Sequence, residues 1–227
     1  MMNKQSGDMY GFVTHTWNVI KGKCSHDCCY CYMKRFPQKD LWFDEKEFKT
    51  DLEKGNIIFV GSSTDMFAKD VPESWIKRVL AFCLVNNKNT YLFQTKNPER
   101  FYDFEEFFGD NIILGITLET NRENDLGRCD KREYRASDFQ YFSENYKHIN
   151  KFKTMVTIEP IMQFDLEKFV SWIKDIKPDF INIGADSNNK KSYSFQEPSK
   201  EDVLKLVEEL REFTEIKKKD NLKRLLK

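Results

Sequence analysis

Three cysteines within one short run are the residues of this chain best suited to chemistry. The run Cys24-Ser-His-Asp-Cys28-Cys-Tyr-Cys31 has the spacing C-x3-C-x2-C, with an aromatic residue directly before the last cysteine. Three thiolates on one loop can each bind one iron of a cubane [4Fe–4S] cluster, so Cys24, Cys28 and Cys31 are the predicted metal ligands. The fourth iron then has no protein ligand and is open to a substrate or cofactor. The motif predicts a cluster that does chemistry rather than one that only carries electrons.

The same cysteines have an alternative interpretation as a zinc site. Structural zinc takes four ligands in a tetrahedron. The fourth ligand would have to be His26, Cys29, His15 or a distant residue, because the sequence holds no second C-x2-C pair. Cys29 directly follows Cys28 and is expected to point away from it. We therefore favour the iron–sulfur interpretation and predict that Cys29 is not a ligand.

Short apolar runs alternate with helical patterns along the chain, and together they predict the fold. The predicted strands are 10–14, 56–60, 90–94, 112–118, 154–158 and 180–183. The predicted helices are 43–54, 72–83, 98–108, 138–148, 165–174 and 199–213, with Ser199 as a possible cap of the last one. Continuous apolar runs indicate strands that are covered on both faces. Repeated β–α units build a parallel sheet, and six units are fewer than a closed barrel needs. We predict an α/β fold, an incomplete (β/α)6 TIM-like barrel with parallel strands.

The sequence shows no linker, repeat or low-complexity stretch that would divide it. We therefore expect a single domain over 1–227, with its core at about 10–213. The segment 214–227 carries six basic residues against two acidic ones, and we expect it to form a solvated basic C-terminal helix.

Polar residues follow several of the predicted strands, where the sites of such folds form. Thr117 and Glu119 are two residues apart and share one side of the fourth strand. Glu159 follows the fifth strand, and Gly184 and Asp186 follow the sixth. We expect the three acids to meet at one rim, where they would bind ribose hydroxyls or substrate. Gly184 would let the backbone approach the cofactor closely.

The ordered set of motifs resembles a known superfamily. Thr-Trp-Asn precedes the cysteines, and Ser-Ser-Thr-Asp, Thr-Lys-Asn-Pro-Glu-Arg, Gly-Ile-Thr-Leu-Glu, Ile-Glu-Pro and Asn-Ile-Gly-Ala-Asp follow in order. This order is similar to the radical S-adenosylmethionine (radical SAM) superfamily. Within it, the order most resembles the small, phage-associated DUF5131 family, related to spore photoproduct lyase and DNA-repair photolyase-like proteins. The resemblance spans roughly residues 10–190.

The resemblance implies two cofactors, a [4Fe–4S] cluster and S-adenosyl-L-methionine (SAM). In that superfamily the methionine moiety of SAM chelates the open iron, and reductive cleavage yields a radical that abstracts hydrogen from a substrate. By resemblance, Tyr30 would lie against the adenine, and Asp65 would hold the SAM ammonium with help from Ser62 and Ser63. Lys96 would pair with the SAM carboxylate as a compact point charge.

The resemblance predicts an oxygen-sensitive enzyme but leaves its substrate open. A nucleotide or nucleic-acid base and a small molecule are both candidates, and a flavodoxin or ferredoxin is the expected electron donor. Repair lyases carry a hydrogen-donor thiol near the Ser-Asp run, where this chain has Ser62 and Ser63. Cys129 in a later loop is a possible substitute. The missing thiol puts thymine-dimer repair in doubt.

Two other function classes remain open. A glycyl-radical-enzyme activase shares the cysteine spacing, but those enzymes usually carry a Gly-Gly-Glu type motif that this sequence lacks at strand two. A zinc-stapled, non-enzymatic binding module is the third possibility. Measuring bound metal and sulfide would separate the first two classes from the third.

Composition narrows the possible partners and the compartment. Lys plus Arg equals Asp plus Glu at 37 each, so there is no global attraction to nucleic acid or to an anionic membrane. No apolar run is long enough to span a bilayer, and the first residues show no secretory signal. Cysteines crowded into one loop are typical of metal ligands in a reducing compartment. We expect a cytoplasmic protein without membrane contact.

Overall fold

The computed structural model describes residues 1–123, 128, 131–187 and 195–227. Within them, one eight-stranded sheet has the order β1-β2-β5-β6-β7-β8-β9-β10, and a separate pair is formed by β3 and β4. The strands are β1 Asn3–Lys4, β2 His15–Trp17, β3 Ile20–Lys21, β4 Trp42–Phe43, β5 Ile57–Val60, β6 Thr90–Thr95, β7 Ile112–Thr117, β8 Lys153–Ile158, β9 Phe180–Ile183 and β10 Glu215–Lys218. All neighbours in the large sheet are parallel except β1 and β2. Cys129 lies outside the described residues.

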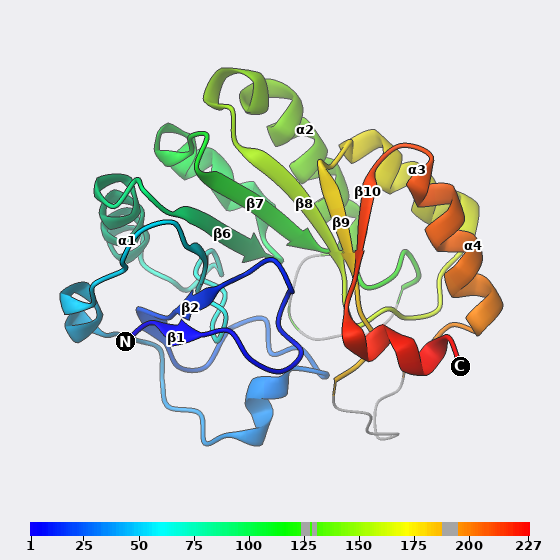
Figure 1. The fold of residues 1–227 in the computed structure, drawn as a ribbon, viewed down its shortest axis with the longest axis horizontal. Coiled ribbons are helices and arrows are strands. Elements are labelled where there is room, and N and C mark those ends of the chain that lie inside the picture. The colour runs from blue at the N-terminus through cyan, green and yellow to red at the C-terminus, as the bar shows by residue number, and fades with distance from the viewer. Residues whose placement is uncertain (124–127, 129–130, 188–194) are drawn as a thin grey trace.

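The sheet is curved and open, with helices around its outside (Figure 1). The α-helices are α1 Glu73–Val85, α2 Arg132–Asn150, α3 Leu166–Ile176 and α4 Lys200–Arg211. The 3₁₀ helices are η1 Tyr32–Arg35, η2 Glu45–Lys49, η3 Pro98–Phe107 and η4 Asp220–Leu225. Strands β1 and β10 are the two ends of the sheet and do not pair with each other. The predicted incomplete parallel β/α barrel is confirmed.

Alternate residues of the central strands are buried on opposite faces. Leu92 and Ile113 point into the barrel with Tyr10 and Phe180, whereas Phe93 belongs to the larger cluster beneath the helices. Burial on both faces explains why these strands read as continuous apolar runs. The loop between β1 and β2 supplies Tyr10 to the barrel interior, so this loop fills the barrel from one side.

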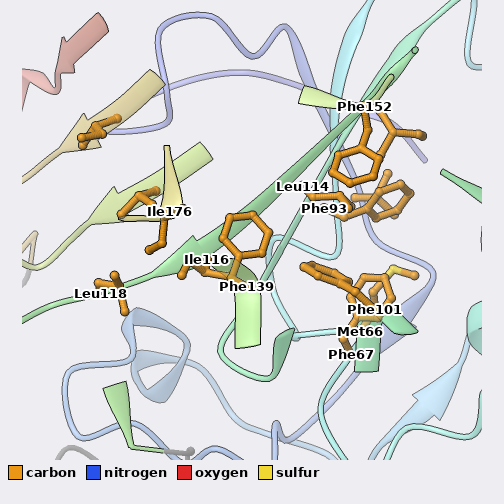
Figure 2. Packing of buried hydrophobic residues seen from close by; sticks show 14 of the residues in the cluster. Met66, Phe67, Phe93, Phe101, Leu114, Ile116, Leu118, Phe139, Phe152 and Ile176 are labelled. Atoms are coloured by element: carbon orange, nitrogen blue, oxygen red, sulfur yellow. The ribbon is translucent and has the colours of Figure 1, made fainter. Parts of the chain in front are cut away.

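Several buried phenylalanines pack between the sheet and the helices, among Leu, Ile and Met side chains (Figure 2). We call this cluster the aromatic layer; it consists of Phe67, Phe93, Phe101, Phe104, Phe108, Phe139, Phe142 and Phe152. The Phe67 and Phe101 rings meet edge to face with centroids 4.9 Å apart, and the Phe142 and Phe152 rings stack at 5.7 Å. Such ring pairs add to the stabilisation from apolar burial itself.

Most predicted helices are present, but two of them have a different geometry. Helix α1 follows Pro72 and buries Ile76 and Cys83, and Ser199 caps α4 by accepting a hydrogen bond from the Asp202 N–H at 3.1 Å. The segments expected to be helical at 43–54 and 98–108 contain the 3₁₀ helices η2 and η3 instead of α-helices.

The predicted C-terminal helix over 214–227 is wrong. Strand β10 pairs parallel with β9, and the 3₁₀ helix η4 follows it. The edge of β9 offers unpaired backbone groups, which β10 satisfies. Leu222 is buried, and Ile216, Leu225 and Leu226 pack against the main core. The tail is therefore part of the barrel rather than a solvated appendage.

No described helix combines the length and the apolar composition that crossing a membrane would require.

Candidate functional site

A cavity of about 420 Å³ lies where the parallel strands end. Cys24, Cys28 and Cys31 all line it. Of the nine predicted cofactor-binding residues, seven also line it: Tyr30, Ser62, Ser63, Asp65, Lys96, Thr117 and Glu159. Glu119 and Gly184 are not among the described lining residues. The cysteine loop and the strand ends thus enclose one common space, as expected of a barrel of this type.

The cysteine loop is folded into two short turns. The Asp27 N–H donates to the Cys24 carbonyl at 3.2 Å, and the Cys31 N–H donates to the Cys28 carbonyl at 3.1 Å. Cys28 is buried, while Cys24 and Cys31 are half-buried. Cys29 is half-buried and is not among the described residues that line the cavity.

The environment of Cys24 disfavours a free thiolate. Burial and the nearby Asp65 carboxylate raise the pKa of the Cys24 thiol to about 12. A metal at this loop would have to displace the proton, because thiolates and not thiols bind iron or zinc. The described residues contain no group of three or more His, Cys, Asp or Glu side chains arranged to hold a single metal ion.

Asp65 is a carboxylate of the cavity wall that accepts four hydrogen bonds. Its Oδ2 accepts from His26 Nε2 at 2.8 Å, from Thr95 Oγ1 at 2.9 Å and from the Lys96 N–H at 2.9 Å. Its Oδ1 accepts from the Phe67 N–H at 3.0 Å. Burial would raise the pKa of Asp65, but His26 and Lys96 together bring it below the ordinary value. Asp65 stays ionised and joins the cysteine loop to the ends of β5 and β6.

Ser62 and Ser63 lie beside Asp65 and are held by Asn18. The Ser63 N–H donates to Asn18 Oδ1 at 3.0 Å, and the Asn18 amide donates to Ser62 Oγ at 3.2 Å. The Tyr32 hydroxyl donates to the Ser62 carbonyl at 2.9 Å. This segment follows β5 and forms the wall of the cavity between the cysteine loop and β6.

Glu119 was expected at the rim, but the structure buries it completely beneath the cavity. It accepts a hydrogen bond from the Tyr30 hydroxyl and forms an ion pair with Arg135 of α2 at 3.2 Å. Arg135 is also fully buried and donates to the Thr117 carbonyl at 2.6 Å. Burial would raise the pKa of Glu119, but Arg135 and Lys96 bring it below its usual range.

Lys96 and Tyr30 lie together on the cavity wall. The Lys96 ammonium is 5.5 Å from the centroid of the Tyr30 ring, and the Phe195 ring meets the same ring edge to face. Lys96 is thus a cation that faces an aromatic ring and two carboxylates, the half-buried Asp65 and the fully buried Glu119. Arg100, the other cation of this motif, instead donates to the Ala68 and Val71 carbonyls and does not appear among the described lining residues.

Glu159 forms the opposite wall with a cation that the sequence analysis missed. Lys219 donates to both carboxylate oxygens of Glu159, at 2.7 and 2.8 Å. Asn221 donates to the same carboxylate at 3.1 Å and to the Ala185 carbonyl at 2.9 Å. Burial raises the pKa of Glu159 despite the opposing effect of Lys219.

Gly184 lies against the Glu159 carboxylate of this wall. A Cβ at Gly184 would lie 2.8 Å from the carboxyl carbon of Glu159. The missing side chain therefore makes room for the Glu159 carboxylate. Of the three acids expected at one rim, Glu159 and Asp186 line the cavity, and Glu119 lies below it.

Tyr10 and Gln94 complete the floor and were also missed. The Tyr10 hydroxyl donates to Gln94 Oε1 at 2.8 Å and lies 3.2 Å from Thr157 Oγ1, while Gln94 Nε2 donates to Thr117 Oγ1 at 2.9 Å. The Lys219 ammonium is 4.9 Å from the centroid of the Tyr10 ring. Gln94 was recognisable as the last polar residue of its apolar run, but Tyr10 looked like a strand residue.

This arrangement defines the class of fold. The chain is similar in structure to a variant of spore photoproduct lyase with a dinucleoside spore photoproduct, with a TM-score of 0.63, 10% identity, and 98% of this chain and 78% of the other covered. It is also similar to a double variant with bound AdoMet and the same product, with a TM-score of 0.60, 9% identity and 97% and 76% coverage. The chain thus has the partial barrel fold of spore photoproduct lyase.

Sequence comparison gives the family. The model of DUF5131, described as a protein of unknown function, matches residues 9–145. The chain belongs to the DUF5131 family, which confirms the resemblance seen in its motifs. No curated protein matches it in sequence.

Proposed function

We propose that this protein is a radical SAM enzyme. Such an enzyme uses a [4Fe–4S] cluster to cleave SAM reductively, and the resulting radical abstracts hydrogen from a substrate. The observation that carries the proposal is that Cys24, Cys28 and Cys31 line one cavity with the polar ends of the parallel strands. Three thiols on one side, and cationic, carboxylate and hydroxyl groups on the other, match what the cluster and SAM require.

The donor set of the cavity fits both cofactors. Cys24, Cys28 and Cys31 would hold the cluster. Lys96 supplies a positive charge for the SAM carboxylate, and its contact with the Tyr30 ring keeps that charge at the wall. We propose that the ring of Tyr30 borders the adenine.

The remaining predicted residues receive more specific roles. Ser62 and Ser63 offer polar groups for the SAM ammonium. Asp65 contributes its negative charge there, but its oxygens already accept four hydrogen bonds. The main role of Asp65 is to hold the cysteine loop against the end of β6. Thr117 and the Glu159 carboxylate would face ribose or substrate hydroxyls. Glu119 would position Tyr30, and Gly184 would leave room for the Glu159 carboxylate.

We propose a nucleotide or nucleic-acid base as the substrate class. The solved relatives hold a dinucleoside photoproduct, and that likeness supports a base-sized group in this cavity. A small molecule is the alternative, because the chain has no net charge to attract a polyanion. Substrate binding that weakens steeply with salt supports a nucleic acid, and substrate binding that is insensitive to salt supports a small molecule.

The electron donor would be a flavodoxin or a ferredoxin, and the enzyme would be inactivated by oxygen. A glycyl-radical-enzyme activase is the less favoured function, because the Gly-Gly-Glu type motif is missing after β5. The chain has Gly61-Ser-Ser-Thr at that place. Co-purification with a large enzyme that carries a glycyl radical would favour it.

Metal and sulfide analysis tests the proposal against the zinc module. Anaerobic reconstitution of the wild-type chain is expected to give about four irons and four sulfides per chain. Cys28→Ser is expected to lose them, and Cys29→Ser, which changes the neighbouring thiol, is the matched control and is expected to keep them. One tightly bound zinc without sulfide would contradict the proposal.

A further inference from the structure

We propose that His26 and Tyr30 are positioning residues that hold the cysteine loop in shape before iron is bound. This inference rests on the proposed function, because it concerns how the chain receives its cluster. Each of the two residues lies between a different pair of cysteines, and each ties its part of the loop to a different carboxylate, Asp65 or Glu119.

The first anchor joins the loop to β5 and β6. His26 lies between Cys24 and Cys28, its side chain is 7% exposed, and Nε2 is 2.8 Å from Asp65 Oδ2. Asp65 is itself fixed by Thr95 and the Lys96 N–H, so it offers His26 an immobile partner. Breaking this contact would leave the half-buried Asp65 carboxylate with one donor fewer, which costs stability.

The second anchor joins the loop to β7 and α2. Tyr30 lies between Cys28 and Cys31 and is buried, and its hydroxyl donates to Glu119. Glu119 is paired with Arg135, and neither side chain has any exposed surface. Hydrogen bonds to an ionised partner are stronger than neutral ones, and buried ones are directional. The hydrogen bond to Glu119 therefore favours one orientation of the Tyr30 side chain.

Together the anchors constrain the loop on both sides of its central cysteine. Cys28 lies between them in sequence, and its backbone carbonyl also accepts from the Cys31 N–H. A loop that is already ordered loses little conformational entropy when it binds a ligand. Side chains behind the ligands commonly set the geometry of metal sites in this way. The chain would thus present its thiols pre-arranged, and cluster assembly would not have to fold the loop.

Two variants that put an apolar aromatic ring in place of the hydrogen-bonding side chain test this. Tyr30→Phe and His26→Phe are compared with Tyr91→Phe, whose hydroxyl donates to the Asn86 carbonyl at 2.9 Å, and with His15→Phe, whose ring nitrogen is 3.0 Å from Thr14 Oγ1. None of the control residues is among the described residues lining the cavity. Circular dichroism melting confirms that each variant folds.

Hydrogen exchange of the metal-free protein is the first readout. Amides of the 24–32 peptide are expected to exchange about tenfold faster in both anchor variants, with the β8 peptide unchanged. The second readout is the rate at which visible iron–sulfur absorbance appears during anaerobic reconstitution, which is expected to fall several-fold in the anchor variants only. The electron paramagnetic resonance line shape of the reduced cluster is expected to broaden, since the loop is less uniform.

The outcomes separate this inference from the proposed function. Unchanged exchange in both anchor variants overturns the inference, and so does faster exchange with unchanged assembly. If the wild-type chain takes up no iron or sulfide, the proposed function fails, while the exchange data still decide whether the anchors order the loop.

Discussion

The outer face of the sheet and the cavity at its strand ends are stabilised in different ways. Beneath the helices, the aromatic layer packs neutral rings around Phe101 and Phe142, with centroids 5.6 Å apart. At the cavity, the wall instead holds charged groups, the half-buried Asp65 and the fully buried Glu119 and Arg135. Apolar burial is non-directional and tolerates adjustment, whereas buried charges must meet their partners in one geometry. The comparison suggests that the layer supplies stability and the cavity wall supplies position.

The largest expected effect comes from breaking the fully buried ion pair. Arg135→Met would leave the buried Glu119 carboxyl without its ion-pair partner and is expected to lower the free energy of unfolding by about 4–5 kcal/mol. Urea denaturation measures this loss. The double variant Arg135→Met, Glu119→Gln removes both charges and should recover part of it. Equal losses in the two variants would show that the charge pair is not the reason for the loss.

The aromatic layer provides the second test. Phe101→Ala removes a fully buried ring that contacts four other rings of the layer and is expected to cost about 3–4 kcal/mol. At low temperature, where the variant remains folded, its cysteine loop should take up iron as the wild type does. If Phe101→Ala had wild-type stability but impaired iron uptake, the aromatic layer would position the cysteine loop rather than stabilise the fold, which would contradict the account.

The Glu159 wall provides the third test. Lys219→Met leaves the Glu159 carboxylate with Asn221 and is expected to cost about 2–3 kcal/mol at pH 8. Burial already raises the pKa of Glu159, and losing the cation raises it further. An acid with a raised folded-state pKa loses stability as pH rises, so the deficit should shrink between pH 8 and pH 5. Lys217→Met, a nearby lysine whose ammonium lies over Phe180, is the control and should show no such pH dependence.

The smallest effect is expected at the amino-terminal ends of β8 and β9, the ends away from the cavity. Asp179 accepts from the Thr154 N–H at 2.6 Å and from Lys147 at 2.7 Å. Burial would raise the pKa of Asp179, but these contacts bring it below its ordinary value. Its contribution is therefore present above pH 4 and lost as pH falls through the folded-state pKa. Asp179→Asn is expected to cost about 1 kcal/mol at pH 7, since the pair is partly exposed, and less at pH 3. A cost that does not change with pH would contradict this.

The sequence predicted the aromatic-layer side of the barrel better than the cavity wall. Runs such as 112–118 and 154–158 are apolar throughout because both faces are buried, and that signal is local. Strand β10 was missed because Glu215-Ile-Lys-Lys is mostly charged and becomes a strand only beside β9. A charged sequence at a sheet edge carries little local signal for its state.

The site residues also differ in how well the sequence predicted them: local patterns were recognised, and long-range contacts were not. The cysteine spacing is a local pattern, and Cys24, Cys28 and Cys31 were found from it. Glu119 was expected at the rim because it shares a side with Thr117, but β7 ends at Thr117 and the distant Arg135 draws the carboxylate inward. Lys219 reaches Glu159 only through β10, so no reading of either segment alone could have paired them.

The most direct test of the account is whether the reconstituted protein cleaves SAM. Anaerobic wild-type protein given SAM and dithionite is predicted to form 5′-deoxyadenosine, Cys28→Ser to form none, and Cys29→Ser to form it at close to the wild-type rate. Absence of 5′-deoxyadenosine from a wild-type preparation that carries about four irons and four sulfides per chain would contradict the central claim.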